Sequence, residues 1–154
     1  MLYRKYRLPI EDATISKTIS SLDQSILDNA YILYFKLNKI LNMKFTKKTS
    51  VLLIIFISSK MMIEDIDITC VDILDLINIT GTKNREDYLD LLIIYEVIMC
   101  RLCGYRFFIS HEDYISYLND KSKYVKLLKS DAGLNNWRLW GHDIKCFTSF
   151  SFYQ

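Results

Sequence analysis

Two charged side chains stand alone in the most apolar stretches of this 154-residue chain. Lys60 ends the run VLLIIFISSK (residues 51–60), and Glu96 lies inside the run YEVIMCRLCGY (residues 95–105). A charge on an apolar helix costs free energy unless an opposite charge or a hydrogen-bonding group meets it. We therefore expect Lys60 and Glu96 to mark a functional surface, where they pair with each other or with another protein.

Cysteine and histidine form a second pattern with chemical potential. Cys100-x-x-Cys103 and His142-x-x-x-Cys146 have the ligand types and local spacings of a zinc site. The competing interpretation is structural, because Cys100 and Cys103 share one apolar helix face, where a buried thiol acts as a small hydrophobic side chain. We favour the structural interpretation and expect no metal and no other cofactor.

Catalytic arrangements are missing from the sequence. Neither His111 nor His142 has the neighbouring serine, cysteine or acid of a catalytic unit. The acidic runs at residues 64–67 and 86–90 are typical of solvated faces and helix starts, and there is no glycine-rich phosphate loop. We expect a protein that is not an enzyme.

Composition favours a single helical domain. Hydrophobic residues make up 51% of the chain, which is enough for a core and excludes a disordered protein. One proline and four glycines are too few for the many tight turns of a β-sandwich or barrel. The expected fold class is all-α.

Charge is unevenly spread although its net value is only +2. Residues 1–48 carry nine basic and four acidic side chains, residues 60–96 carry three and nine, and residues 97–154 carry eight and five. No basic face large enough to neutralise many phosphates is evident, so we do not expect a nucleic-acid partner.

The expected location is inside a cell, in the cytoplasm or nucleus. The start MLYRKYRLP lacks the apolar core and the cleavage site of a signal peptide, so reduced thiols are expected. The longest uncharged apolar stretch, residues 49–59, is about half of a membrane span, so we expect no membrane contact. We also expect the protein to be a monomer by itself. Frequent Ile, Lys, Asn, Tyr and Phe are typical of an AT-rich genome such as a virus, in which case the cell is a host cell.

Apolar residues recur at helical spacing along most of the chain. The expected helical segments are a short one after Pro9, one from Asp23 or Ser25 to Leu41, one from Thr46 or Thr49 to Met62, one over residues 69–81, one from Asn84 to Gly104, one from Ser110, capped with Asp113, to Leu118, and a basic one over residues 121–129. The third is apolar on every side, so the others must enclose it; its β-branched residues also permit a buried strand, but its length favours a helix.

Two of these helices have a predicted buried face. In the second helix it comprises Leu27, Ala30, Tyr31, Tyr34, Leu37 and Leu41, with Lys36 and Lys39 outside. In the fifth it comprises Leu89, Leu92, Ile93, Met99, Cys100 and Cys103. We expect the basic segment to pack on its own domain. The aromatic last twenty residues either cover the core or bind a partner, and both options stay open.

The two apolar blocks together resemble the cyclin box. VLLIIFISSKMMIED (residues 51–65) resembles the box helix that ends in Ala-Ser-Lys before acidic residues, with Ser59 and Lys60 on the last two positions. YEVIMCRLCGYRFFISHEDYISYL (residues 95–118) resembles the fifth box helix, in which a Glu precedes Ile-Leu, then Leu-Gly-Phe, then a turn and a short helix. Glu96 stands at the position of that Glu, and Gly104 at the position of the glycine.

The resemblance implies a cyclin-like five-helix domain over residues 25–118 around a central apolar helix. An N-terminal segment with a short helix (residues 1–24) precedes it, and a basic helix with an aromatic tail (residues 119–154) follows. It also implies a cyclin-dependent kinase as partner, in cell-cycle or transcription control. In cyclins the matching Lys and Glu hydrogen-bond main-chain groups around the kinase's regulatory helix. The implied partner-binding residues are Lys60, Glu96, Phe56, Met61, Met62 and Ile63.

The chain also departs from the family. No arginine lies between Arg7 and Arg85, so the substrate-docking arginine of many cyclins has no counterpart, and too few residues follow position 118 for a second box. The alternative is a non-catalytic helical adaptor that binds host or transcription-related proteins through the acidic middle or the aromatic tail. Nucleic-acid binding by a cyclin-like fold of the general transcription factor kind is disfavoured by the acidic excess over residues 60–96.

Overall fold

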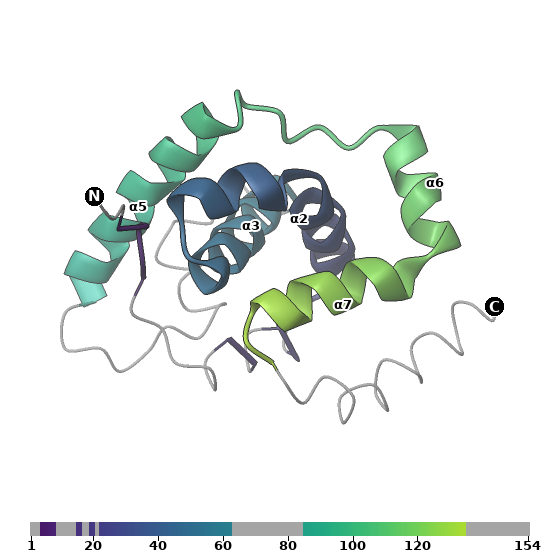
Figure 1. Ribbon diagram of the computed structural model, residues 1–154, viewed down its shortest axis with the longest axis horizontal. Helices are drawn as coiled ribbons and strands as arrows, with labels where there is room; N and C mark the ends of the chain where they lie inside the picture. The colour runs from purple at the N-terminus through teal and green to yellow at the C-terminus, as the bar shows by residue number, and fades with distance from the viewer. Residues whose placement is uncertain (1–3, 9–14, 17–18, 21, 63–84, 135–154) are drawn as a thin grey trace.

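The computed structural model of the protein describes residues 4–8, 15–16, 19–20, 22–62 and 85–134. In chain order and with the labels of Figure 1, its helices are α2 (Gln24–Lys44), α3 (Lys47–Met62), α5 (Arg85–Leu102), α6 (His111–Asn119) and α7 (Lys121–Asp131). These described residues form no strand, and a single parallel bridge joins Tyr6 to Phe45. The all-α prediction is confirmed.

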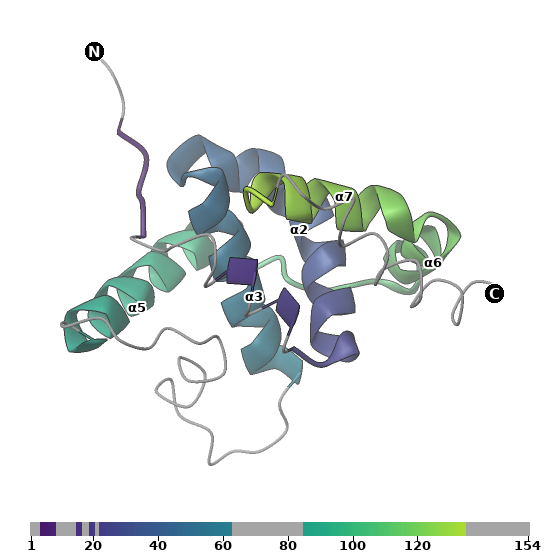
Figure 2. The same ribbon diagram turned by 90° about the horizontal axis from the view of Figure 1, so that it is seen from below.

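Helices α2 and α3 lie against each other at the centre of the fold (Figures 1 and 2). Every residue of the face predicted for α2 is buried, while Lys36 and Lys39 are exposed. In α3 the six consecutive residues Val51–Phe56 are all buried. Because α3 has no polar face over these turns, it is enclosed by α2, α5 and α7, as its sequence predicts.

The N-terminal segment is fastened to the turn between α2 and α3. The Tyr6 N–H donates to the Lys44 carbonyl (2.7 Å), and the Thr46 N–H donates to the Tyr6 carbonyl (3.0 Å). Two residues on, the Leu8 N–H donates to the Thr49 hydroxyl oxygen at 2.9 Å. Residues 4–8 therefore run beside the start of α3, far from it in sequence but adjacent in space.

In helix α5 the predicted face is partly confirmed; the side chain of Leu89 lies outside the described part, and Cys100 is half-buried. Leu92, Tyr95, Met99 and Cys103 face the core with the three- and four-residue spacing of a helix, whereas Ile93 is 39% exposed. The prediction that Ile93 is buried is wrong, because a continuous apolar run does not reveal which side packs. Residues Gly104 and Tyr105 then follow with φ values of +60° and +59°, which end the helix where the glycine predicts.

Helix α6 begins with the predicted capping box. The Asp113 N–H donates to the Ser110 hydroxyl (3.1 Å), and the Ser110 N–H donates to the Asp113 carboxylate (3.0 Å). The Lys36 ammonium binds the same carboxylate at 2.8 Å and the Phe108 carbonyl at 3.0 Å. These bonds join the start of α6 to α2.

The basic helix α7 packs on the domain, as predicted. Its buried side chains include Val125 and Leu128, and it contacts both α2 and α3. The helix predicted over residues 69–81 and the last twenty residues lie outside the described part of the chain. The five-helix cyclin arrangement and the boundaries at residues 24 and 118 therefore stay predictions.

Replacing Ile54 by Ala tests the central position of α3. Ile54 is completely buried, so Ile54→Ala is expected to lower the free energy of unfolding by about 2–5 kcal/mol through lost transfer energy and the cavity left behind. The matched control is Ile94→Ala on α5, where the side chain is 54% exposed and a change of about 0.5 kcal/mol is expected. Urea unfolding followed by circular dichroism measures both; equal losses would contradict the described packing.

Protonation of the Asp113 carboxylate is expected to lower the free energy of unfolding in acid. Hydrogen bonds from Lys36 and Ser110 hold the pKa of its carboxyl below the ordinary value, so it binds a proton less readily folded than unfolded. Its contribution is therefore complete above about pH 4 and is lost as the pH falls through the lowered folded-state value. Unfolding curves from pH 6 to pH 2 should fall less steeply for Asp113→Asn than for the wild type. Asn119→Ser, at an exposed site without a titratable group, is the control and should follow the wild-type curve.

Candidate functional site

The end of α3 and the middle of α5 bring Lys60 and Glu96 into contact. The Lys60 ammonium lies 2.9 Å from Oε1 and 3.0 Å from Oε2 of Glu96, so both carboxylate oxygens accept hydrogen bonds from it. Their side chains are 35% and 16% exposed. The two charges predicted to mark a surface thus meet at one, partly shielded from water and still accessible from outside.

The aromatic ring of Phe56 lies next to the ammonium of this ion pair. Phe56 precedes Lys60 by one helical turn, and the Lys60 ammonium lies 5.4 Å from the centre of its ring. The Phe56 side chain is fully buried, so it offers no surface to another protein. This corrects the expectation that Phe56 contacts a partner directly. Its ring instead packs against the Lys60 ammonium at the end of α3.

The other expected contact residues lie on the last turn of α3 and beyond it. Met61 is 47% exposed and stands beside Lys60 in sequence. Met62 is the last residue of α3, but its side chain lies outside the described part, as does Ile63 entirely. Met61 is therefore the described apolar neighbour of the ion pair on α3.

Two small buried residues let the end of α3 approach α2. The Ser59 hydroxyl donates to the Ile55 carbonyl one turn back (2.8 Å), and the Ser58 hydroxyl accepts a hydrogen bond from the Asn29 amide of α2 (3.2 Å). Both serines are fully buried. The Asn29 contact was not expected from the sequence. Its signal would have been a polar residue next to Ala30, which belongs to the apolar face of α2.

Helix α5 exposes several apolar side chains: Ile93 lies one helical turn before Glu96 on the same side and is 39% exposed, whereas Ile94 and Val97 lie on the face opposite the core. Ile94 and Val97 are 54% and 44% exposed, which is unusual for residues of this kind in neighbouring positions. The sequence analysis missed them as surface residues. The signal was available in the helical spacing, since a buried face through Leu92, Tyr95 and Met99 turns positions 94 and 97 outward.

The two helix thiols have hydrophobic character. Burial raises the pKa of the Cys103 thiol to about 11. Burial also raises the pKa of the half-buried Cys100 thiol; the negative charge of Glu96 raises it further, and the positive charge of Lys60 lowers it in part. Both are therefore protonated at neutral pH, whereas a zinc ligand is a thiolate. His142 and Cys146, the other members of the zinc pattern, lie outside the described residues. Within the described part no three His, Cys, Asp or Glu side chains gather closely enough to hold a metal.

The arrangement is suited to recognition of another protein. An ammonium that donates, a carboxylate that accepts and exposed apolar neighbours form a mixed surface of the kind that binds polypeptide. His111 is exposed at the start of α6 and has no part in this surface. Among the described helices, none is long and apolar enough to cross a membrane.

No protein-family model, curated protein or solved structure matches this chain. The resemblance to the cyclin box therefore depends on the two apolar blocks and on the contact between Lys60 and Glu96.

A double-mutant cycle measures what the ion pair contributes to folding. Lys60→Met, Glu96→Gln and the double variant are expected to give a coupling energy of about 0.5–1 kcal/mol, because a partly exposed pair gains little over its interactions with water. Chemical unfolding in low and high salt provides the measurement, and the coupling should shrink in high salt. A coupling of several kcal/mol would instead make the pair a structural element of the fold.

Proposed function

We propose that this protein is a non-catalytic regulatory subunit that binds a cyclin-dependent kinase through the end of α3 and the side of α5 that carries Glu96. The observation that carries the proposal is the contact between Lys60 and Glu96, which the cyclin resemblance assigns to the kinase-facing surface. These two residues are separated by 36 positions and lie on different helices, and their contact supports the proposal.

The preformed pair suits a partner that presents main-chain groups. An ammonium has three N–H donors and a carboxylate has two acceptor oxygens, so each keeps hydrogen-bonding capacity while they bind each other. Main-chain carbonyls would accept from Lys60, and main-chain N–H groups would donate to Glu96. Exclusion of water on binding strengthens both kinds of bond.

The apolar neighbours supply the contact area that two polar groups lack. Met61, next to Lys60 in sequence on α3, and Ile93, one helical turn before Glu96 on α5, are exposed apolar side chains beside the pair. Their removal from water would provide a favourable, non-directional contribution, while the pair fixes orientation. Regulation follows if the surface binds the active kinase conformation more tightly than the inactive one, because a partner shifts an equilibrium only by that difference.

Binding to purified kinases tests the proposal. The wild-type protein is immobilised and exposed to a panel of recombinant cyclin-dependent kinases, and Lys60→Ala/Glu96→Ala is expected to weaken binding by about tenfold or more. The matched control is Lys36→Ala/Asp113→Ala, which removes the ion pair between α2 and α6 at a distance from the proposed surface. Failure to bind any kinase, or equal binding by the two double variants, would contradict the proposal.

A helical adaptor of another class is the second candidate, and α6 favours it. The exposed apolar side chains of this helix are Tyr114, Ile115 and Leu118, and Phe108 before it is 77% exposed. Residues 63–84 of the acidic middle and the aromatic tail first considered for this function lie outside the described residues. Leu118→Lys separates the candidates: loss of a partner that Lys60→Ala/Glu96→Ala still binds identifies α6 as the interface.

A further inference from the structure

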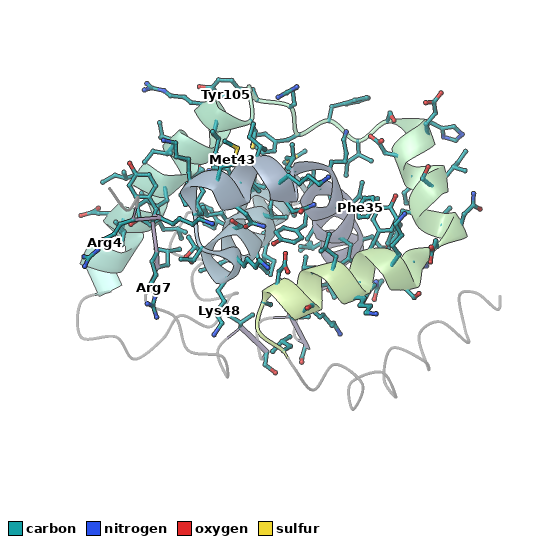
Figure 3. The ribbon with its side chains drawn as sticks, in the orientation of Figure 1. Arg4, Arg7, Phe35, Met43, Lys48 and Tyr105 are labelled. Carbon is teal, nitrogen blue, oxygen red and sulfur yellow. The ribbon has the colours of Figure 1, made fainter. Side chains whose placement is uncertain are left out.

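Helix α5 lies at one edge of the molecule, with a face turned away from α2 and α3 (Figures 1 and 2). The four residues on this face, here called the α5 stripe, are all exposed: Asp90, Ile94, Val97 and Arg101. Because an α-helix turns by about 100° per residue, they fall within about 60° of its circumference, opposite the side that packs on the core. In Figure 3 side chains of α5 project outward along this edge, as far as Tyr105 just beyond the helix.

The α5 stripe is complementary to itself when two copies run in opposite directions. Its midpoint lies between residues 95 and 96: Asp90 precedes that midpoint by as many positions as Arg101 follows it, and the same holds for Ile94 and Val97. A two-fold axis through the midpoint therefore places Asp90 of each copy opposite Arg101 of the other. It likewise places Ile94 of each copy opposite Val97 of the other, so charges meet opposite charges and apolar groups meet apolar groups.

The two charged ends of the stripe are available for such a contact. Among the described residues, neither the Asp90 carboxylate nor the Arg101 guanidinium has an ion-pair or hydrogen-bond partner. Glu96, which binds Lys60, lies roughly 130° around the helix from the centre of the stripe. A contact through the stripe would therefore leave the ion pair of Lys60 and Glu96 accessible to another protein.

The size of the stripe indicates a weak and reversible association. Packed helices lie about 8–10 Å apart, which lets Ile94 and Val97 touch across the axis, and a shallow crossing keeps the helices together over the roughly three turns from Asp90 to Arg101. Such a contact is smaller than the about 1,600 Å² of a standard stable interface. Its apolar residues would supply most of the affinity, whereas exposed ion pairs contribute little energy and fix the antiparallel register.

We propose that two copies of this chain associate through their α5 stripes, antiparallel about a two-fold axis. A second copy is the partner that the stripe fits, because the order acid, apolar, apolar, base is complementary to its own reverse. The proposed dimer departs from the monomer expected from the sequence. It does not depend on the proposed kinase binding, since the Lys60–Glu96 surface lies on another side of α5.

Reversal of the charges in the stripe tests the proposal. Sedimentation velocity of the full-length wild-type protein is expected to show a dimer fraction that rises with concentration. Asp90→Arg brings like charges together at both ends of the contact, as does Arg101→Asp, and each is expected to weaken association by about tenfold. The double variant Asp90→Arg/Arg101→Asp restores opposite charges and is expected to associate as the wild type does.

A mixture of the two single variants gives the sharpest measurement. Neither Asp90→Arg nor Arg101→Asp should associate well by itself, but together they are expected to form a heterodimer, because each charge of one variant then faces an opposite charge of the other. Lys39→Asp, a charge reversal at an exposed site of α2, is the control and should associate as the wild type does. Circular dichroism shows that each variant is folded. A wild type that stays monomeric at millimolar concentration, or a mixture that associates no better than its components, would overturn the proposal.

Discussion

The burial of α3 is the constraint on which the rest of the structure depends. Val51–Phe56 present apolar side chains to every side, and a helix of this kind leaves no face that water can cover. Helices α2, α5 and α7 must therefore enclose it. Since the middle of α3 is fully occupied by packing, polar chemistry on this helix is confined to its two ends.

Each end of α3 carries charged side chains for that reason. At the C-terminal end Lys60 emerges from the core and meets Glu96, and at the N-terminal end Lys47 and Lys48 stand beside Arg7. A helix rises about 1.5 Å per residue, so the two ends of this 16-residue helix lie about 20 Å apart. That separation exceeds a Debye length at physiological salt, so charges bound at one end act only weakly on the other.

The sequence predicts the helices of this fold better than their contacts. The face of α2 could be identified because charged residues such as Lys36 interrupt it at helical spacing, whereas Leu91–Ile94 of α5 are uniformly apolar and only packing decides that Ile93 points outward. Periodicity says nothing about residues 36 positions apart, so the contact of Lys60 with Glu96 was expected only from the cost of two lone charges on apolar helices and from the family resemblance. The place of Arg7 beside the start of α3 was missed, because backbone hydrogen bonds of Tyr6 bring Arg7 to α3 and leave no side-chain pattern in the sequence.

The ion pair of Lys60 and Glu96 is partly exposed, so it contributes little to the free energy of folding. The interaction between the two charges adds little to folding, since such pairs gain about as much from water as from each other. What the pair provides is direction: it fixes one donor and one acceptor at a known separation on a rigid pair of helices. If the proposed complex forms, a partner without matching groups would remove water from the pair and leave its remaining donor and acceptor sites unfilled. In that complex the pair would contribute most to the choice of partner, and the exposed apolar side chains would contribute most to the affinity.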